Sequence, residues 1–358
     1  MPEGGTSHKT GPPTGENRAQ NMAEEMTGVR ELTYTQALNE ALREELEADP
    51  RVFLMGEDIG DYGGVFGVTR GLAERFGTGR IRDTPISEAA FVGVALGAAA
   101  MGKVPVVEIM FIDFTLVAMD QIVNQVAKAR YMSGGQLHAQ MVIRTTAGAY
   151  RGGGAQHSQS LEALFVHIPG LKVAMPATPY DAKGLLKTAI QDPDPILFIE
   201  HRMLYSTRGA VPQTPYTIPL GVASVRREGR DVTIVATSRM VAFALEAAAS
   251  LQRRGISVEV IDPRTLVPFD WHTITQSLAK TGRVVIVHEA TEFGGIGAEI
   301  AAHLQRIGFD FLDAPILRVG SRFAPIPYAA PLEAEVLPSV DRIIQAVEEV
   351  LGKRKPPS

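Results

Sequence analysis

The feature that most constrains the fold is a regular alternation of short apolar runs with stretches of helical periodicity. The runs are rich in β-branched residues and bounded by glycine, proline or charge, which is typical of strands buried on both faces of a sheet. Strands are predicted at residues 52–55, 104–109, 141–143, 171–175, 196–199, 232–237, 258–262 and 284–288. Helices are predicted after a capping box at Thr33 and Gln36, and then at residues 118–131, 179–191, 240–254, 271–279 and 296–307. This alternation predicts βαβ units and parallel sheets.

One segment without this periodicity divides the chain. Residues 203–222 contain three prolines, two glycines and scattered hydroxyl side chains, so neither a helix nor a central strand is expected there. We therefore predict an α/β fold with two open parallel-sheet domains. The predicted segments are a disordered extension at 1–27, a first domain at 28–205, a linker at 206–221, a second domain at 222–352 and a tail at 353–358.

The composition excludes several classes of protein. The chain has 358 residues and no cysteine, which excludes disulfides, thiolate metal sites and a cysteine nucleophile. A net charge of −5 gives no electrostatic footprint for nucleic acid or an anionic membrane. The longest apolar run, residues 89–101, is shorter than the roughly 20 residues that span a bilayer, and the first residues show no apolar signal sequence. We expect a bacterial cytoplasmic protein whose partners are small molecules or other proteins.

Two glycine-containing segments have some features of phosphate-binding loops. Residues 97–104 have the spacing of a phosphate loop, but Val104 stands where a Ser or Thr should hold magnesium and the interior is alanine-rich. We interpret this segment as a helix whose Ala/Gly face packs against a neighbour. Residues 294–297 (GGIG) open a predicted helix after a strand, but no acidic residue follows at dinucleotide spacing. A glycine-mediated helix start is favoured there over an anion site.

Glu57 and His157 are the first polar candidates for a functional site. Glu57 leaves an apolar strand at the carboxyl edge of the predicted sheet, where open α/β sheets bind ligands and where partial burial raises a carboxyl pKa. The alternative, which spacing alone favours, is a turn with two solvated acids, Glu57 and Asp58. His157 follows three glycines, residues 152–154, and lies among hydroxyl and amide side chains. This loop fits proton transfer around a small substrate, and it fits equally well a surface loop in which the imidazole caps a neighbour.

Further strand ends carry His201 and the pair His288 and Glu289, which are additional candidates. None of the eight histidines has the His-x-x-x-His or His-Glu-x-x-His spacing of a zinc site. The Gly-x-Ser-x-Gly motif of a Ser-His-Asp hydrolase does not occur either. These absences exclude two common classes of enzyme.

A series of linked motifs, in one order along the chain, resembles a known family. The motifs are GED at 56–58, DTPISE at 83–88, MFIDF at 110–114, DQ at 120–121, YMSGG at 131–135, QHSQ at 156–159, PGLKV at 169–173, DAKGL at 181–185, DPRTL at 262–266 and HE at 288–289. Together they resemble the beta subunit of 2-oxo acid dehydrogenase decarboxylase components, which are transketolase-like, thiamine-diphosphate-dependent enzymes. The resemblance covers roughly residues 30–350. It implies a transketolase-like pyrimidine domain followed by a transketolase C-terminal-type domain.

The resemblance also implies partners and cofactors. It implies an α2β2 heterotetramer with thiamine diphosphate at each α/β interface. In that family the alpha subunit holds the diphosphate and magnesium through a Gly-Asp-Gly…Asn-Asn motif, which this chain lacks. Magnesium is therefore expected on the alpha subunit. The beta subunit is expected to supply the pyrimidine side, and its C-terminal domain to dimerise the assembly and dock the dihydrolipoamide acyltransferase core.

Four residues match functional positions of the family. Glu57 matches the glutamate that hydrogen-bonds the pyrimidine ring nitrogen and drives tautomerisation of the cofactor. Phe114 matches an aromatic residue that packs on the pyrimidine. His157 matches a histidine near the reacting ketone, where it stabilises the intermediate or assists acyl transfer to lipoamide. Asp192 falls where relatives bind structural potassium, although the next two residues differ from some relatives and a solvated loop carboxylate is the alternative.

The implied reaction is oxidative decarboxylation of a 2-oxo acid. Branched-chain members carry Tyr at the position of Phe114 and Pro-Lys in place of His201 and Arg202, so a smaller substrate is favoured. Pyruvate is predicted, with acetoin and branched-chain 2-oxo acids as alternatives. A catalytically silent scaffold subunit is the non-enzyme alternative, which the intact Glu57, Phe114 and His157 disfavour. A free-standing transketolase is disfavoured because 358 residues are too few for both cofactor-binding halves.

Overall fold

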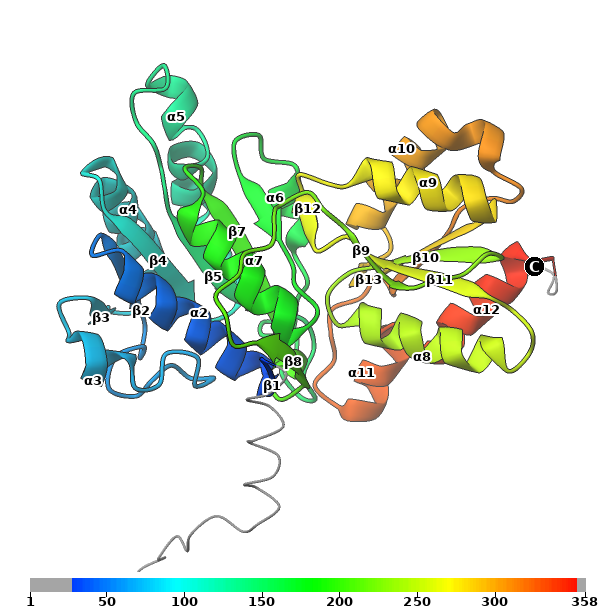
Figure 1. The fold of residues 1–358 in the computed structure, drawn as a ribbon, viewed down its shortest axis with the longest axis horizontal. Helices are drawn as coiled ribbons and strands as arrows, with labels where there is room; N and C mark the ends of the chain where they lie inside the picture. The colour runs from blue at the N-terminus through cyan, green and yellow to red at the C-terminus, as the bar shows by residue number, and fades with distance from the viewer. Residues whose placement is uncertain (1–27, 353–358) are drawn as a thin grey trace, which may run out of the picture.

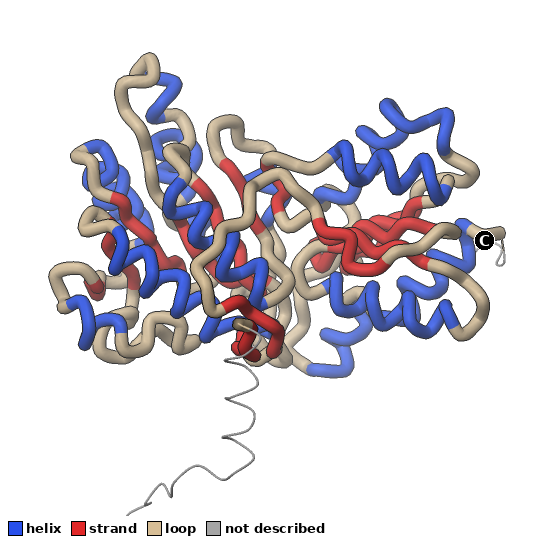
Figure 2. Tube along the Cα trace, in the orientation of Figure 1, coloured by secondary structure: helices blue, strands red, loops and turns tan. Residues whose placement is uncertain are grey.

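The computed structural model describes residues 28–352 and shows two sheets side by side, each flanked by helices (Figures 1 and 2). The extension predicted at residues 1–27 and the tail at residues 353–358 lie outside the described residues. Between residues 28 and 352, no helix is long and apolar enough to cross a membrane. The predicted fold class, two open and mainly parallel α/β sheets, is confirmed.

The first sheet has seven strands in the order β12-β6-β7-β5-β4-β2-β3. Its strands are β2 (Val52–Gly56), β3 (Ile81–Asp83), β4 (Val104–Ile109), β5 (Val142–Ala147), β6 (Lys172–Ala174), β7 (Ile196–His201) and β12 (Thr265–Val267). All neighbours are parallel except β12 and β6. Every residue of β5 and β7 is buried, so the central strands are covered on both faces, as their apolar runs predict.

Helices cover both faces of this sheet. Two of them, α2 and α7, pack on one face, while α4 and the segment 112–126 pack on the other. The helices are α2 (Tyr34–Ala48), α3 (Leu72–Phe76), α4 (Glu88–Ala100), α5 (Ala129–Met132), α6 (Glu162–Val166) and α7 (Pro179–Gln191). The capping box of Thr33 and Gln36 is confirmed at the start of α2. Residues 97–100 are the last turn of α4, as predicted, but Gly97 is exposed and a Cβ atom there would have no neighbour within 4 Å, so the predicted packing of an Ala/Gly face is not found at Gly97.

The single helix predicted at residues 118–131 is wrong. A π-helix, η2 (Gln121–Val126), precedes the short α5, and the Ala127 amide donates to the Ile122 carbonyl five residues back. Ile122 and Val126 are both buried, and their spacing of four fits a π-turn as well as an α-turn. Apolar periodicity over so few residues does not distinguish the two helices.

The second sheet has five strands in the order β14-β13-β10-β11-β9. They are β9 (Ser224–Arg227), β10 (Val232–Ala236), β11 (Val258–Asp262), β13 (Val284–Thr291) and β14 (Leu317–Ser321), and only β9 is antiparallel to its neighbour. The helices α8 and α12 cover one face, and α9 and α10 cover the other. The helices of this part are α8 (Met240–Gln252), α9 (Trp271–Thr281), α10 (Ile296–Gly308), α11 (Ala330–Val336) and α12 (Val340–Val350).

Two short strands pair in ways that the sequence did not indicate. Within the predicted linker, β8 (Arg208–Pro212) pairs antiparallel with β1 (Val29–Thr33). After β11, the chain returns to the first sheet, where β12 pairs with β6 at its edge. Arg226, from β9, pairs with Asp181 of α7 and with Asp262 of β11, and Arg264 also pairs with Asp181. These buried ion pairs hold the two sheets together.

Candidate active site

Three of the predicted site residues follow three neighbouring strands. Glu57 follows β2, Phe114 lies in η1 (Ile112–Leu116) after β4, and His157 lies in the loop after β5. These strands are adjacent and parallel in the order β5-β4-β2, so their carboxyl ends meet at one edge of the sheet. The fold therefore places three residues that are far apart in the sequence at the same edge of the sheet.

An aromatic cluster surrounds the imidazole of His157. Its ring centroid lies 5.4 Å from that of Phe114 and 5.2 Å from that of Phe111, with the rings nearly perpendicular in both pairs. Tyr150 stacks on Phe111, and the guanidinium carbon of Arg202 lies 3.6 Å from the centroid of Tyr150. His157 and Phe114 thus share one site, and their chemical roles stay predictions.

The carboxyl group of Glu57 is partly buried and incompletely partnered. Oε1 is buried and has no hydrogen-bond partner in the described part of the chain. Burial raises the pKa of Glu57, and the nearby carboxylates of Glu88 and Asp58 raise it further. Asp58 itself is exposed and adopts a left-handed backbone conformation with φ 54°, so it makes the turn. A turn with two solvated acids therefore describes Asp58 but not Glu57.

The loop that carries His157 is closed at its base. The Gly148 amide donates to the Gln159 carbonyl at 3.0 Å, and Gln159 Nε2 donates to Asp113 Oδ1 at 2.7 Å. Asp113 is the residue before Phe114, and its side chain is buried. The loop and the aromatic segment are therefore held against each other.

A buried ion cluster, which no sequence motif indicated, crosses the centre of the sheet. Arg144 of β5 donates to Glu200 of β7 at 2.7 and 3.0 Å and to Glu108 of β4 at 2.7 Å. Glu200 also accepts from the Tyr205 hydroxyl at 2.7 Å. Burial raises the pKa of Glu200, although Arg144 opposes this shift. The available signal was a charged residue inside each of three apolar strands.

The strand-end candidates His201 and Glu289 come together from the two sheets. His201 Nε2 lies 2.9 Å from Glu289 Oε2, and His201 Nδ1 accepts from the Met203 amide at 3.1 Å. Burial acts to raise the pKa of Glu289, but His201, Arg239 and the Ala149 amide outweigh burial and lower it. This pair is a structural link between the halves of the chain.

His288 and the glycine-rich segment 294–297 pack against each other. His288 is buried, which lowers its pKa to about 4, and its Nδ1 lies 3.1 Å from the Ala290 carbonyl. A Cβ atom on Gly295 or Gly297 would lie 2.5 Å from the imidazole ring. The glycines therefore allow α10 to start close to His288, which supports the helix-start interpretation over an anion site.

Asp192, the predicted potassium ligand, ends α7. Its carboxylate oxygens accept from Lys172 Nζ at 2.6 and 2.8 Å, and Lys172 also pairs with Asp194 at 3.3 Å. Within residues 28–352, no three His, Cys, Asp or Glu side chains gather in a group that could hold a metal. The Lys172 ammonium thus supplies positive charge at this turn, and the potassium site stays a prediction.

Comparison with known families and structures defines the class of protein. The models for the transketolase pyrimidine binding domain and the transketolase C-terminal domain match residues 30–208 and 221–343. A solved split gene transketolase, described as an inactive beta4 tetramer, gives a TM-score of 0.72 at 26% identity over 90% of this chain and 99% of that chain. The two sheets are therefore those of a transketolase-like protein.

Comparison with individual relatives shows which transketolase-like family the chain belongs to. The mitochondrial pyruvate dehydrogenase E1 component subunit beta-2 of Oryza sativa is 46% identical, with 92% of this chain and 88% of the relative covered. The acetoin:2,6-dichlorophenolindophenol oxidoreductase subunit beta of Bacillus subtilis is 46% identical, with 91% and 98% covered. The pyruvate dehydrogenase E1 component subunit beta of Rhizobium meliloti is 45% identical, with 91% and 71% covered. The chain belongs to the family of transketolase-like beta subunits that includes these proteins, and the predicted resemblance is confirmed.

This family implies thiamine diphosphate, and the residues at the sheet edge fit the pyrimidine side of that cofactor. Within residues 28–352, Glu57 Oε1 is buried without a hydrogen-bond partner, which leaves it free to meet a ring nitrogen, and burial raises the pKa of this carboxyl group. Phe114 presents a partly buried ring in the same cluster as His157. The donor set and the aromatic surface are thus those that a flat, nitrogen-containing ring needs.

Proposed function

We propose that this chain is the beta subunit of a bacterial, cytoplasmic 2-oxo acid dehydrogenase that acts on pyruvate. It works with an alpha subunit in an α2β2 heterotetramer, uses thiamine diphosphate, and passes the acyl group to lipoamide of a dihydrolipoamide acyltransferase core. The observation that carries the proposal is the buried oxygen of Glu57 at the carboxyl edge of the sheet, which has no hydrogen-bond partner in the part of the chain that the structure describes. A silent scaffold subunit has no need of such a group, since an unpartnered buried oxygen only costs stability.

The residues of this chain have distinct tasks in that reaction. When bound, the cofactor supplies the nucleophilic carbon that attacks the substrate ketone. Glu57 holds a proton at the carboxyl group and shares it with the pyrimidine ring nitrogen. Phe114 orients the pyrimidine by ring packing, which adds no competing hydrogen bond. His157, held against Phe114, places an imidazole where it can hold or transfer a proton near the reacting ketone.

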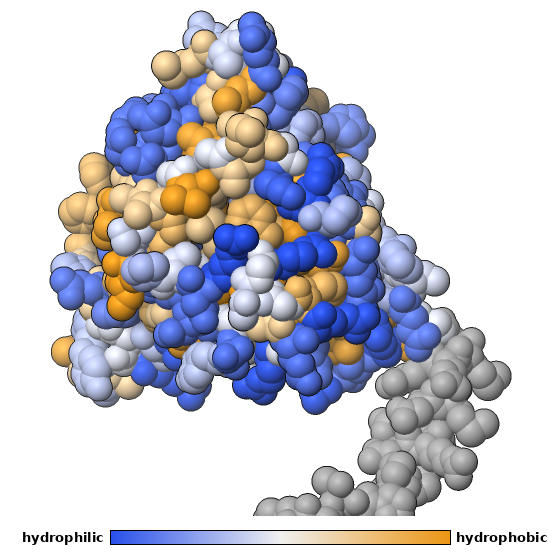
Figure 3. All heavy atoms as spheres, turned by 90° about the vertical axis from the view of Figure 1, so that its left-hand side faces the viewer, coloured by the Kyte–Doolittle hydropathy of each residue, from blue (hydrophilic) through white to orange (hydrophobic). Residues whose placement is uncertain are grey.

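An exposed apolar surface beside the site supports the alpha subunit as a partner. Figure 3 shows apolar side chains gathered on the side of the molecule where α4 and α5 lie. Seven large apolar residues there are at least 47% exposed: Ile86, Val94, Met101, Leu116, Val117, Tyr131 and Met132. Leu116 and Val117 follow Phe114 closely in the chain. An apolar surface of this kind next to an incomplete site fits a subunit interface, with the diphosphate and magnesium on the partner.

Substitution of Glu57 tests this function. Glu57→Gln keeps the shape of the side chain but removes the proton, so turnover of the assembled enzyme should fall by about 10²–10⁴-fold. Asp58→Asn is the matched control, because Asp58 is exposed and Asn tolerates its left-handed backbone. The control should keep turnover within a few-fold of wild type. Near-normal turnover of Glu57→Gln in an intact heterotetramer would remove Glu57 from the mechanism.

Acetoin is a second candidate substrate because a relative of equal identity, 46%, is named for it. A panel of pyruvate, acetoin and branched-chain 2-oxo acids, assayed with the matching alpha subunit, compares kcat/KM directly. Pyruvate is expected to give the highest value. A higher value for acetoin or for a branched-chain acid would replace pyruvate without changing the role of Glu57.

A further inference from the structure

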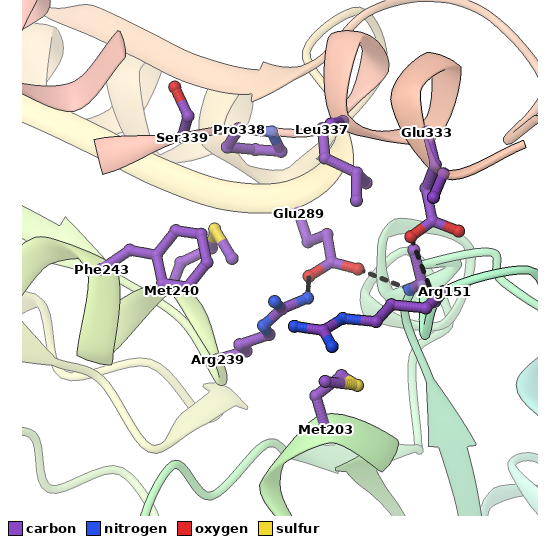
Figure 4. A pocket seen from close by; sticks show the side chains of 13 residues that line it. Arg151, Met203, Arg239, Met240, Phe243, Glu289, Glu333, Leu337, Pro338 and Ser339 are labelled. Carbon is purple, nitrogen blue, oxygen red and sulfur yellow. Dashed lines mark hydrogen bonds and ion pairs between the residues drawn. The ribbon is translucent and has the colours of Figure 1, made fainter. Parts of the chain in front are cut away.

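The loop before His157 is held by carboxylates from the second half of the chain. The Ala149 amide donates to Glu289 Oε1 at 2.7 Å. The Arg151 and Gly152 amides donate to Glu333 Oε1 and Oε2, both at 3.1 Å. Figure 4 shows Glu289 of β13 and Glu333 of α11 directed at this loop from two sides. A loop whose glycines suggest flexibility thus has three amides fixed by two acidic side chains.

Both carboxylates are buried and oriented for this contact. Glu289 is 8% exposed and Glu333 is 5% exposed. A carboxylate that accepts two neighbouring backbone amides, one on each oxygen, fixes both the position and the direction of the peptide.

The packing of the loop leaves little room for another conformation. A Cβ atom on Gly148 would lie 2.1 Å from His201 Nε2 and 2.7 Å from Glu289 Oε1. The ring of Tyr328 lies within 4 Å of the Cβ positions of Gly152 and Gly154. Arg151 has a left-handed backbone with φ 64°, a conformation that a non-glycine residue keeps only when its surroundings hold it. The two Glu333 hydrogen bonds act at and beside this strained residue.

The held segment connects directly to His157. Tyr150 lies between the two anchored positions, Ala149 and Arg151, and stacks on Phe111 with ring centroids 5.9 Å apart. Phe111 in turn contacts the His157 imidazole. A shift of the backbone at residues 149–152 therefore displaces the aromatic wall against which His157 rests.

We infer that Glu333 is a positioning residue, which holds the loop so that His157 has its working orientation. Glu289 shares this task from the other side of the loop. The inference rests on the proposed function for the role of His157. It adds Glu333, a residue of the second domain, to those that shape the site, and Glu333 acts there only through the backbone of the loop.

The first test measures the loop without using turnover. In the assembled heterotetramer, Glu333→Gln leaves only one acceptor oxygen for the two amides, so hydrogen exchange of residues 148–157 should rise about tenfold. Glu335→Gln is the matched control, because Glu335 lies on the same helix and its side chain is 76% exposed. Glu333→Asp keeps the charge on a shorter side chain and should give an intermediate rate. Unchanged exchange in Glu333→Gln would overturn the inference.

The second test asks whether Glu333 acts through His157. Lipoamide-coupled turnover is compared for wild type, Glu333→Gln, His157→Ala and the double variant. We expect Glu333→Gln to lower kcat about tenfold in the wild-type background and to add almost nothing to His157→Ala, because residues that act as one unit are not additive. If Glu333→Gln lowers kcat by the same factor in wild type and in His157→Ala, its effect is a general structural one and the inference is overturned.

The proposed role of His157 and the positioning role of Glu333 would be contradicted by different results. If His157→Ala turns over normally, the proposed role of His157 is wrong, and the positioning role of Glu333 in the reaction falls with it. If His157→Ala is impaired while Glu333→Gln shows wild-type kcat, only the positioning role is wrong. Size-exclusion chromatography of each variant confirms that the heterotetramer is the species compared.

Discussion

Glu162 provides a quantitative test of how burial controls charge near the site. It lies in the first turn of α6, just after the His157 loop, and is 1% exposed. Its Oε2 has no hydrogen-bond partner among residues 28–352. Burial raises the pKa of Glu162 from 4.5 to about 7, and the charge of Glu289 contributes to the rise. The folded protein therefore keeps this carboxyl protonated at mildly acidic pH.

The sign of the effect follows from comparing the folded and unfolded states. As pH rises above 4.5, the unfolded chain ionises Glu162 while the folded chain keeps its proton, so the folded state loses relative stability until pH passes about 7. The difference between about 7 and 4.5 corresponds to about 3 kcal/mol. Glu162→Gln resembles the protonated side chain at every pH. The variant should therefore match wild type at about pH 4 and be up to about 3 kcal/mol more stable at about pH 8.5.

Urea denaturation of the purified chain, followed by circular dichroism across this pH range, measures the difference. Glu299→Gln is the control, because Glu299 is exposed on α10 and its surroundings change little on unfolding. That control should show no pH-dependent difference from wild type. A Glu162→Gln difference that is the same at both pH values would mean that Glu162 is not kept protonated by burial, and the reasoning would be wrong.

Two further predictions concern the ionic groups. Arg144→Met should destabilise the fold by about 3–5 kcal/mol, because it leaves Glu200 buried without its partner, whereas Arg51→Met at an exposed pair should cost less than about 1 kcal/mol. Denaturation midpoints of the two variants measure these losses of stability, and equal losses in Arg144→Met and Arg51→Met would contradict the prediction. If Asp192 binds potassium, replacing potassium by sodium should lower the melting temperature of wild type but not of Asp192→Ala. Equal wild-type melting temperatures in the two salts would remove that site.

The sequence predicted those strands whose position depends on a single physical signal, the continuous run of apolar residues. Long apolar runs gave β4 and the first residues of β5 and β7, because strands buried on both faces need continuous apolar residues. The strands β3 and β12 lie at the two edges of the first sheet and have only three residues each, so neither was predicted from an apolar run. The position of β12 depends on contacts with β6 that local sequence does not contain. Short strands at sheet edges are fixed by tertiary pairing, so the apolar periodicity of the local sequence does not predict them.

The candidate site, like the fold, was predicted only in part from the sequence. The position of Glu57 at a strand end followed from topology, whereas the role of Phe114 came only from the resemblance. The contact of His201 with Glu289 joins residues 88 positions apart, and neither neighbourhood indicates the other. Glu333 gave no signal at all, because a carboxylate that accepts backbone amides leaves no motif in the sequence.

Comparison of three carboxyl groups shows what separates a ligand-binding acid from a structural one. Glu289 has the Ala149 amide and His201 as partners, and its pKa is lowered despite burial. Glu162 and Glu57 both have a raised pKa and an oxygen without a hydrogen-bond partner among the described residues, so neither property alone identifies a site. The difference is access, since Glu162 is 1% exposed whereas Glu57 remains partly open at the carboxyl edge of the sheet. A ligand can relieve the cost of the unpartnered oxygen only at Glu57, and this is why the proposed chemistry belongs there.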